Sequence, residues 1–297
     1  MRCGWFGKPL EFNKQNVSGK SKVYGLIGDP IDHSMSPTIQ NAAFRSTGLN
    51  AVYVPFRVES SGLRFAIQGL KFLGVKGFNV TTPHKTAMLR YLDQVESKAA
   101  EIGSINTVKS NRGILTGFNT DGAGALNALK GAGVSPVGKS ILLFGAGGAA
   151  RAIAHTLAGH RCAIDLVNRR VSRAQRLAST LRMRFGIQVN SVSLSNHSLR
   201  RHVESADIIL NASSMGMAGN EHVPIPKKWL RSNQCVFDIV YRPVRTMLLR
   251  NAVLAGARTI NGLDMLVSQG ACSFSIWTGK KAPVSEMRRS IARVTGD

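Results

Sequence analysis

The stretch Ser140-Ile-Leu-Leu-Phe-Gly-Ala-Gly-Gly-Ala-Ala-Arg151 decides the fold, because it joins an apolar strand to a glycine loop and then to a helix. The apolar residues 141–144 lead directly into Gly145-x-Gly147-x-x-Ala150. In such a strand–turn–helix setting a glycine loop indicates dinucleotide binding, because its N–H groups and the positive end of the helix can meet a pyrophosphate. The sequence therefore predicts a Rossmann-type unit at this point of the chain.

The second strand of this unit, residues 163–167, ends where the adenosine ribose of a dinucleotide is expected to lie. An acidic side chain there would bind the 2′-hydroxyl of NAD, but the chain has Asn168-Arg169-Arg170, followed by Arg173. The planar guanidinium group binds phosphate oxygens in pairs. These residues therefore predict NADP rather than NAD.

Length and composition set the broad class. The 297 residues are enough for one or two domains, and no apolar run approaches the roughly 20 residues that a membrane helix needs. Residues 1–21 have no continuous apolar core typical of a secretory signal, and we expect them to form an N-terminal extension. The four cysteines, Cys3, Cys162, Cys235 and Cys272, form no CxxC pair, so we predict no metal site and no disulfide framework. A reduced, cytoplasmic compartment is the expectation.

The formal net charge is +23, and the excess is concentrated in residues 122–258, which carry 19 basic and 5 acidic side chains. A solvated basic surface is one interpretation, and steering of an anionic cofactor and substrate is a second. Nucleic-acid binding is a third, but the chain lacks basic–aromatic interleaving and any known reading motif, so no nucleic-acid partner is expected.

Short apolar runs alternate with helical patterns before the glycine loop, which predicts a parallel-type α/β sheet in this part too. The expected strands are 22–27, 51–57 and 77–80, and the expected helices are 37–47, 61–72 and 83–92. Beyond the nucleotide unit, an apolar helical stretch and a charged terminal helix have no local strands to pack on. We therefore expect a two-domain α/β protein whose C-terminal helices return to the first domain. The expected parts are the extension 1–21, a substrate domain 22–121 completed by 262–297, and an NADP domain 122–261.

Several polar segments at element ends are candidates for chemistry. Ser36 and Pro37 suit the cap and first residue of a helix, but Ser34 and Ser36 would also suit a carboxylate at that helix start. Thr82 and Pro83 could likewise begin a helix and place Lys85 in its first turn. There Lys85 would oppose the helix dipole, which favours either a proton-transfer role or a solvent-facing side chain.

Other polar residues, each taken alone, also fit either a structural or a functional role. His84 is expected on the surface, and Asp121 has the pattern of an ordinary helix cap after a short strand. The segment 103–107 is expected to end a strand too. Gln269 lies in an apolar helix, where a buried amide needs hydrogen-bond partners. The loop 211–216 follows a strand and could border a nicotinamide or be a simple turn.

Together these segments resemble the shikimate dehydrogenase family over residues 22–284, and nine motifs occur in the family's order. They are His33-Ser34-x-Ser36-Pro37, Asn79-Val-Thr81-x-Pro83-x-Lys85, Ile105-Asn106-Thr107, Asn119-Thr120-Asp121-Gly122, Gly145-Ala-Gly147-Gly148-Ala149, Asn168-Arg169, Asn211-Ala-Ser-Ser-x-Gly216, Phe237-Asp238-x-x-Tyr241 and Gly262-x-x-Met265-Leu266-x-x-Gln269.

The resemblance implies a role for each matching residue. Lys85 and Asp121 would form the catalytic pair. The implied substrate contacts are Ser34, Ser36, Asn79, Thr81, Lys85, Asn106, Asp121, Tyr241 and Gln269. The implied cofactor contacts are Gly145, Ala146, Gly147, Gly148, Ala149, Asn168, Arg169, Arg170, Arg173, Ser213, Met217 and Gly262.

The implied reaction is the reversible NADPH-dependent reduction of 3-dehydroshikimate to shikimate in aromatic amino-acid biosynthesis. The alternative is a quinate/shikimate dehydrogenase that uses NAD or NADP, because pocket shape alone decides whether the extra hydroxyl of quinate is accepted. No membrane partner is expected, and a monomer and a homodimer are both compatible with the sequence.

Overall fold

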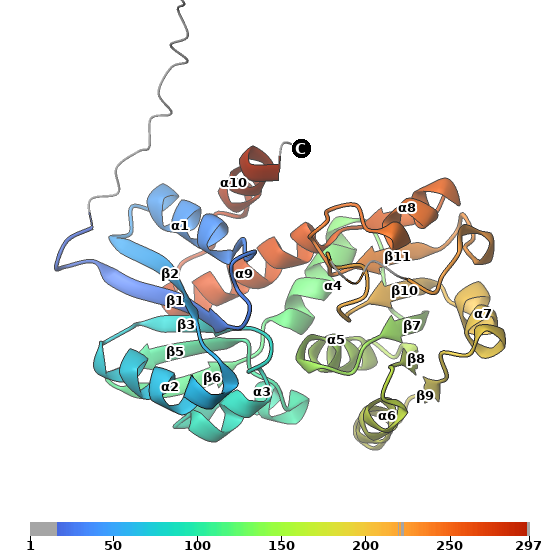
Figure 1. The fold of residues 1–297 in the computed structure, drawn as a ribbon, viewed down its shortest axis with the longest axis horizontal. Coiled ribbons are helices and arrows are strands. Elements are labelled where there is room, and N and C mark those ends of the chain that lie inside the picture. Colours follow the sequence, from blue (N-terminus) through green and yellow to red (C-terminus); the bar gives the residue numbers. More distant parts are fainter. Residues whose placement is uncertain (1–16, 219, 221–222, 296–297) are drawn as a thin grey trace, which may run out of the picture.

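Two six-stranded sheets, built from separate stretches of the chain, form the two halves of the molecule (Figure 1). The computed structural model describes residues 17–218, 220 and 223–295, so most of the predicted extension lies outside the described residues. None of the helices in the described part of the chain is long and apolar enough to span a membrane. The predicted two-domain α/β class is confirmed.

The first sheet has the order β2-β1-β3-β5-β6-β4. Its strands are β1 (Lys22–Gly28), β2 (Ala51–Arg57), β3 (Gly77–Val80), β4 (Gln94–Val95), β5 (Thr107–Asn111) and β6 (Ile114–Phe118). Strands β1, β2 and β3 are parallel as predicted, but β5 runs antiparallel to both β3 and β6. The cause is a two-residue turn in which Arg112 and Gly113 have φ values of 50° and 81°, because such a turn joins neighbouring antiparallel strands.

Helices cover both faces of this first sheet because successive strand residues point to opposite sides. Leu26 packs with α1 (Ser36–Ser46) and with two C-terminal helices, α9 (Gly262–Thr278) and α10 (Val284–Thr295). Ile27 packs on the other face. The elements on that face are η1 (Ser60–Gly62), α2 (Leu63–Phe72), η2 (Ala87–Tyr91) and α3 (Ser97–Ile102). The predicted return of the C-terminal helices to the first domain is therefore confirmed.

The second sheet is parallel throughout and has the order β12-β11-β10-β7-β8-β9. Its strands are β7 (Ser140–Phe144), β8 (Ala163–Val167), β9 (Val189–Val192), β10 (Ile208–Asn211), β11 (Cys235–Asp238) and β12 (Arg258–Ile260). Helices α5 (Gly148–Ala158) and α6 (Val171–Phe185) pack on one face; α7 (Asn196–Ser205), η3 (Lys227–Trp229) and α8 (Met247–Leu254) lie on the other side. This is the doubly wound dinucleotide-binding order, and its switch point lies between β7 and β10.

Helix α4 (Asp121–Gly131) runs beside α9 between the two sheets (Figure 1). The helices approach closely at Gly124, where an added Cβ would lie only 2.9 Å from the backbone nitrogen of Gln269. A larger residue at Gly124 would force the two helices apart. The glycine thus allows the start of α4 and the middle of α9 to share one region of the molecule.

Three local predictions are wrong. Residues 83–92 do not form an α-helix, because the carbonyl of Lys85 accepts a hydrogen bond from the Ile105 N–H (2.8 Å) and only η2 is helical. Helix α1 begins at Ser36 itself, with Met35 at the N-cap and no side-chain cap. Thr107 begins strand β5 and does not end a strand.

Candidate active site

Lys85 and Asp121 form a direct ion pair at the junction of the two halves. Lys85 Nζ lies 2.5 Å from Asp121 Oδ2, and the side chains are 17% and 4% exposed. Lys85 stands on the turn that follows β3, whereas Asp121 is the first residue of α4. Thr120 occupies the N-cap position, so Asp121 is not the cap that its sequence context suggests. The structure thus joins two residues that are 36 positions apart in the chain.

Asn106 holds the second oxygen of the Asp121 carboxylate. Its Nδ2 donates to Asp121 Oδ1 over 2.8 Å, and its Oδ1 accepts from the backbone N–H of Thr120 over 2.8 Å. Gln269 Oε1 lies 3.4 Å from the same Nδ2 and 3.5 Å from Thr120 Oγ1. The predicted residues Lys85, Asn106, Asp121 and Gln269 therefore meet at one place.

Asn79 is tied into the protein beneath this group. Its Oδ1 accepts from the hydroxyl of Tyr53 (2.8 Å), and its Nδ2 donates to the Asn106 carbonyl and to Ser273 Oγ, both over 3.0 Å. Thr81, at the end of β3, is partly exposed. Tyr53 and Ser273 are functional candidates that the sequence reasoning missed, and the only sequence signal was a polar group on an otherwise apolar strand or helix.

The two serines at the start of α1 lie beside two tyrosines. Burial raises the pKa of Tyr53, and a hydrogen bond with Ser36 opposes this. Burial also raises the pKa of Tyr241, and a hydrogen bond with Ser34 opposes it. Because Tyr241 follows β11 of the second sheet, the proposed carboxylate contacts come from both halves of the molecule.

The glycine loop closes the site from the other half. Gly145 has a φ of 114°, and a Cβ there would lie 2.6 Å from the carbonyl oxygen of Ala212, so a side chain is excluded. Gly147 is exposed at the N-cap of α5, with nothing within 4 Å of its Cβ position. At Gly148 a Cβ would lie 2.9 Å from the Cβ of Lys85. The loop therefore offers open space at a helix N-terminus directly beside the lysine.

The predicted 2′-phosphate residues surround the start of α6. Arg169, Arg170 and Arg173 are exposed, and in the described part of the chain none of them forms an ion pair. Asn168 Nδ2 donates to the Arg170 carbonyl over 2.9 Å. Partly buried Arg151 adds a further cation that we did not predict. Burial lowers its pKa, as do the charges of two arginines of α6. Unpaired cations beside an open helix N-terminus fit an anionic dinucleotide.

For three further predicted cofactor contacts, Ser213, Met217 and Gly262, the structure shows contacts within the protein. Ser213 Oγ donates to Asn211 Oδ1 over 2.7 Å, and Met217 forms an isolated bridge with Asn220. Gly262 is buried at the start of α9, where a Cβ would collide with the Ile239 carbonyl oxygen at 2.3 Å. Their contact with a cofactor remains a prediction.

His84 is not on the surface as predicted. It is only 1% exposed, and its Nε2 lies 2.6 Å from the Val58 carbonyl oxygen. The neighbouring side chain of Lys85 reaches the site while His84 anchors the same turn to the substrate half. Among the described residues, no group of three or more acidic, histidine or cysteine side chains could hold a metal ion.

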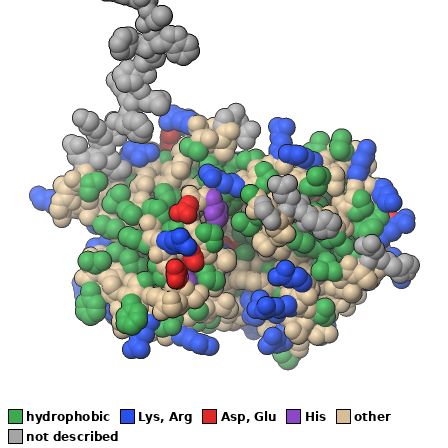
Figure 2. Space-filling view, viewed as in Figure 1, with side chains coloured by type: hydrophobic (Ala, Val, Ile, Leu, Met, Phe, Trp, Pro, Cys, Tyr) green, Lys and Arg blue, Asp and Glu red, His purple; other side chains and the backbone are tan. Residues whose placement is uncertain are grey.

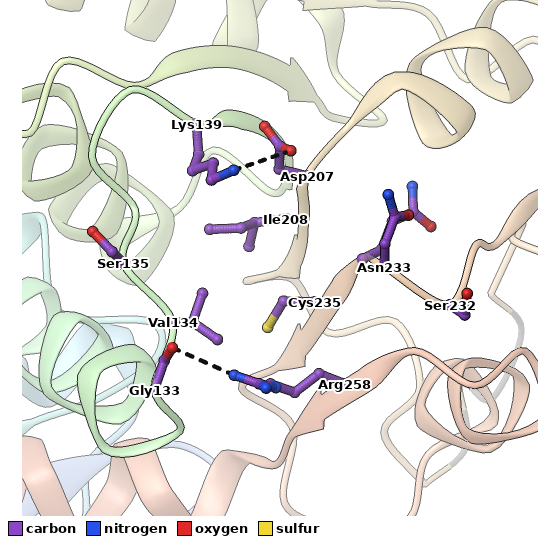
Figure 3. A pocket seen from close by; sticks show the side chains of 11 residues that line it. Gly133, Val134, Ser135, Lys139, Asp207, Ile208, Ser232, Asn233, Cys235 and Arg258 are labelled. Atoms are coloured by element: carbon purple, nitrogen blue, oxygen red, sulfur yellow. Dashed lines mark hydrogen bonds and ion pairs between the residues drawn. The ribbon is translucent and has the colours of Figure 1, made fainter.

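A cavity of about 400 Å³ lies at the opposite, amino-terminal edge of the second sheet (Figure 3). Its charged groups have protein partners. Lys139 faces Asp207 over 3.5 Å, and Arg258 donates to the carbonyl of Ala132 over 2.9 Å. Because parallel α/β sheets bind ligands at the carboxyl ends of their strands, we place the functional site at the glycine loop.

Figure 2 shows Lys and Arg side chains scattered over both halves of the molecule, while acidic side chains gather near the middle of the view. A lysine–carboxylate pair against a dinucleotide loop is the arrangement of an NADP-dependent oxidoreductase, because proton and hydride transfer must meet at one carbon–oxygen bond.

Comparisons with known proteins agree with this class. Family models match in three places: the shikimate dehydrogenase substrate binding domain at 26–108, shikimate / quinate 5-dehydrogenase at 130–244, and the shikimate 5′-dehydrogenase C-terminal domain at 262–291. A curated shikimate dehydrogenase (NADP(+)) of Moorella thermoacetica is 44% identical over 283 residues, which cover 94% of this chain and 96% of the relative.

Two solved structures extend the comparison. A crystal structure of a shikimate dehydrogenase in complex with NADP+ has a TM-score of 0.86 and 41% identity, covering 94% of this chain and 97% of that one. A Listeria monocytogenes shikimate 5-dehydrogenase in complex with shikimate and NAD has a TM-score of 0.86 and 35% identity, covering 94% and 99%. The chain belongs to the shikimate dehydrogenase family.

Proposed function

We propose that this chain catalyses the reversible NADPH-dependent reduction of 3-dehydroshikimate to shikimate. The observation that carries the proposal is the buried Lys85–Asp121 ion pair packed against the glycine loop. Reduction of a ketone develops negative charge on its oxygen, and a nearby ammonium group can stabilise that charge and supply the proton. Family membership supplies the substrate class, and the pair supplies the chemistry.

Each member of the pair has a distinct role in this proposal. Lys85 donates its proton to the substrate oxygen during reduction and accepts it again during oxidation. Asp121 is held by Asn106 on one oxygen and holds Lys85 with the other, so the lysine is oriented before substrate arrives. Acid–base catalysis of this kind contributes about 10²- to 10⁴-fold to the rate.

NADPH supplies the hydride when it is bound. Gly145 to Ala149 would hold its pyrophosphate, because the loop exposes backbone N–H groups at the start of α5. Asn168, Arg169, Arg170 and Arg173 would hold the 2′-phosphate, since guanidinium groups bind phosphate oxygens in pairs. Ser213, Met217 and Gly262 would border the nicotinamide.

The substrate carboxylate would bind Ser34, Ser36 and Tyr241, where three hydroxyl groups converge from the two halves. Asn79, Thr81, Asn106 and Gln269 would contact the ring hydroxyls. We also infer a reduced, cytoplasmic setting, because the cysteines Cys162, Cys235 and Cys272 are free thiols.

Initial rates with shikimate or quinate, each with NADP+ or NAD+, test the proposal. We expect the highest kcat/KM for shikimate with NADP+, and the Lys85→Ala protein gives the background rate. Activity confined to NAD+ would contradict the assignment of the arginines. A higher kcat/KM for quinate than for shikimate would replace the proposed substrate by quinate.

A further inference from the structure

The amide of Asn106 has one orientation fixed by its surroundings. Its Oδ1 accepts from the Thr120 N–H over 2.8 Å, and a backbone N–H can only donate. The Nδ2 group must therefore be the end that faces Asp121 Oδ1, also at 2.8 Å. The orientation of this amide decides whether the catalytic carboxylate receives a donor or meets another acceptor.

Thr107 supplies a second donor to the same amide oxygen. Its Oγ1 donates to Asn106 Oδ1 over 2.9 Å, and the side chain is fully buried at the start of β5. The hydroxyl also accepts from Asn79 Nδ2 over 3.1 Å and lies 2.8 Å from Ser273 Oγ. A single hydroxyl thus connects β3, β5 and α9 directly beneath the catalytic pair.

We propose that Thr107 is a positioning residue for the reaction: its hydroxyl locks the Asn106 amide so that Asp121 and Lys85 keep their geometry. This inference rests on the proposed function. The chain of contacts runs from Thr107 to Asn106, then to Asp121 and Lys85, and each link is a hydrogen bond of 2.9 Å or less.

Loss of the hydroxyl removes the link without removing bulk. Valine has nearly the shape of threonine and suits a buried strand, but it cannot donate to Asn106 or accept from Asn79. Asn106 Oδ1 would then accept only from the N–H and the hydroxyl of Thr120, while Nδ2 would keep Asp121 and Thr120 as its acceptors. The amide would thus lose the one partner that ties its oxygen to β5, and its position would be less restricted. A looser Asn106 amide would hold Asp121 and Lys85 less firmly, so the larger effect falls on kcat. Because Asn106 would also contact a ring hydroxyl, a smaller rise in KM for shikimate accompanies it.

The test compares Thr107→Val, Thr107→Ser and the wild type in shikimate oxidation with NADP+. We expect Thr107→Val to lower kcat about tenfold, with a smaller rise in KM for shikimate, KM for NADP+ within about twofold and a larger solvent isotope effect on kcat. Thr107→Ser, which keeps the hydroxyl, should restore most of kcat. Thr116→Val is the matched control, because Thr116 lies on β6 and, within the described part of the chain, its hydroxyl donates to exposed Gln94 alone.

Three outcomes overturn the inference: an unchanged kcat in Thr107→Val, a rise in KM alone, or an equal loss in Thr107→Ser. If Thr107→Val does not fold, Thr107→Ala removes the hydroxyl together with the methyl group, and its kcat is compared with that of Thr107→Ser. An inactive wild type would instead contradict the proposed function, so the two failures are distinguishable.

Discussion

The two sides of the candidate active site, one from each half of the molecule, are built in opposite ways. On the substrate side, Asn79, Asn106 and Asp121 are at most 5% exposed and bind one another or neighbouring hydroxyls. On the nucleotide side, the groups that face outward are a bare backbone at Gly147 and exposed arginines such as Arg173. One side is preformed by buried hydrogen bonds, and the other presents unpaired charge and open space.

This difference follows from what each side must do. Proton transfer needs groups whose positions are set before reaction, and buried hydrogen bonds provide that preorganisation. Capture of a phosphorylated cofactor needs positive charge that a large anion can reach, and exposed arginines suffice. Substitutions of the Lys85–Asp121 pair should therefore change kcat, whereas substitutions among the arginines should change KM for NADP+.

On the substrate side, Asp121→Asn is expected to have the largest effect, a loss of kcat. The asparagine can keep its oxygen toward Asn106 but then presents an NH₂ group to the Lys85 ammonium, and two donors repel. We expect kcat to fall by about 100-fold with a much smaller change in KM, measured by steady-state kinetics.

The control for this prediction is Asp93→Asn, because Asp93 forms an exposed ion pair with Lys71 in the same half (3.0 Å). Its kcat should equal that of the wild type. A kcat within threefold of wild type in Asp121→Asn would mean that the buried pair is structural.

On the nucleotide side, Arg169→Gln and Arg173→Gln are expected to have a smaller effect, a rise in KM for NADP+. Each removes a charge-assisted hydrogen bond to the 2′-phosphate, which contributes about 1.5–3 kcal/mol and predicts a roughly tenfold or larger rise in KM for NADP+. KM for NAD+ and kcat at saturating NADP+ should not change. Arg250→Gln, an exposed arginine on α8, is the control. An equal rise in KM for both cofactors would place these arginines away from the 2′-phosphate.

The smallest effect concerns Asp238, which among the described residues of the nucleotide side is a buried carboxylate, as Asp121 is on the substrate side. Burial raises its pKa from 3.8 to about 6, although hydrogen bonds from Thr246, Val240 and Asn211 oppose the rise. A raised carboxyl pKa means that the folded state favours the protonated form. Its contribution to stability is therefore complete below pH 3.8 and is lost as the pH rises through about 6.

Urea unfolding from pH 4 to pH 7 tests this. Relative to Asp238→Asn, the wild type should lose about 2 kcal/mol of unfolding free energy over that range. Asp207→Asn is the paired control, because the Ser140 N–H lowers the pKa of Asp207 below 3.8. The stability that Asp207 contributes is lost only as the pH falls below 3.8, so the difference between wild type and Asp207→Asn should stay nearly constant from pH 4 to pH 7. A constant difference between wild type and Asp238→Asn across the range would contradict the raised pKa.

The contrast between the two sides also explains which parts of the site could be predicted from the sequence. The nucleotide side follows from contiguous residues, because strand β7, the glycine loop and α5 are neighbours in the chain, and their predicted order is observed. On the substrate side the motifs were visible, but the contacts of Tyr53 and Ser273 with Asn79 join residues 26 and 194 positions apart. Pattern alone does not predict such pairings.

The α-helix predicted at 83–92 is absent because of a similar long-range contact. Pro83 and the following residues have a local helix-start pattern, but the Lys85 carbonyl is bonded to Ile105. A long-range hydrogen bond thus overrides the local helix preference at Lys85, the residue proposed to supply the proton. The helix propensity of this segment favoured a structure that is not observed. A role for Lys85 could therefore be inferred only from the order of the motifs.

Kinetics of Lys85→Ala test the central claim most directly. The measurement is kcat for shikimate oxidation together with the Kd for NADP+, on protein whose folding is checked by its melting temperature. We predict that kcat falls by about 10²- to 10⁴-fold while the Kd for NADP+ stays within about twofold. A kcat close to that of the wild type would remove Lys85 from the chemistry and contradict the different roles of the two sides of the site.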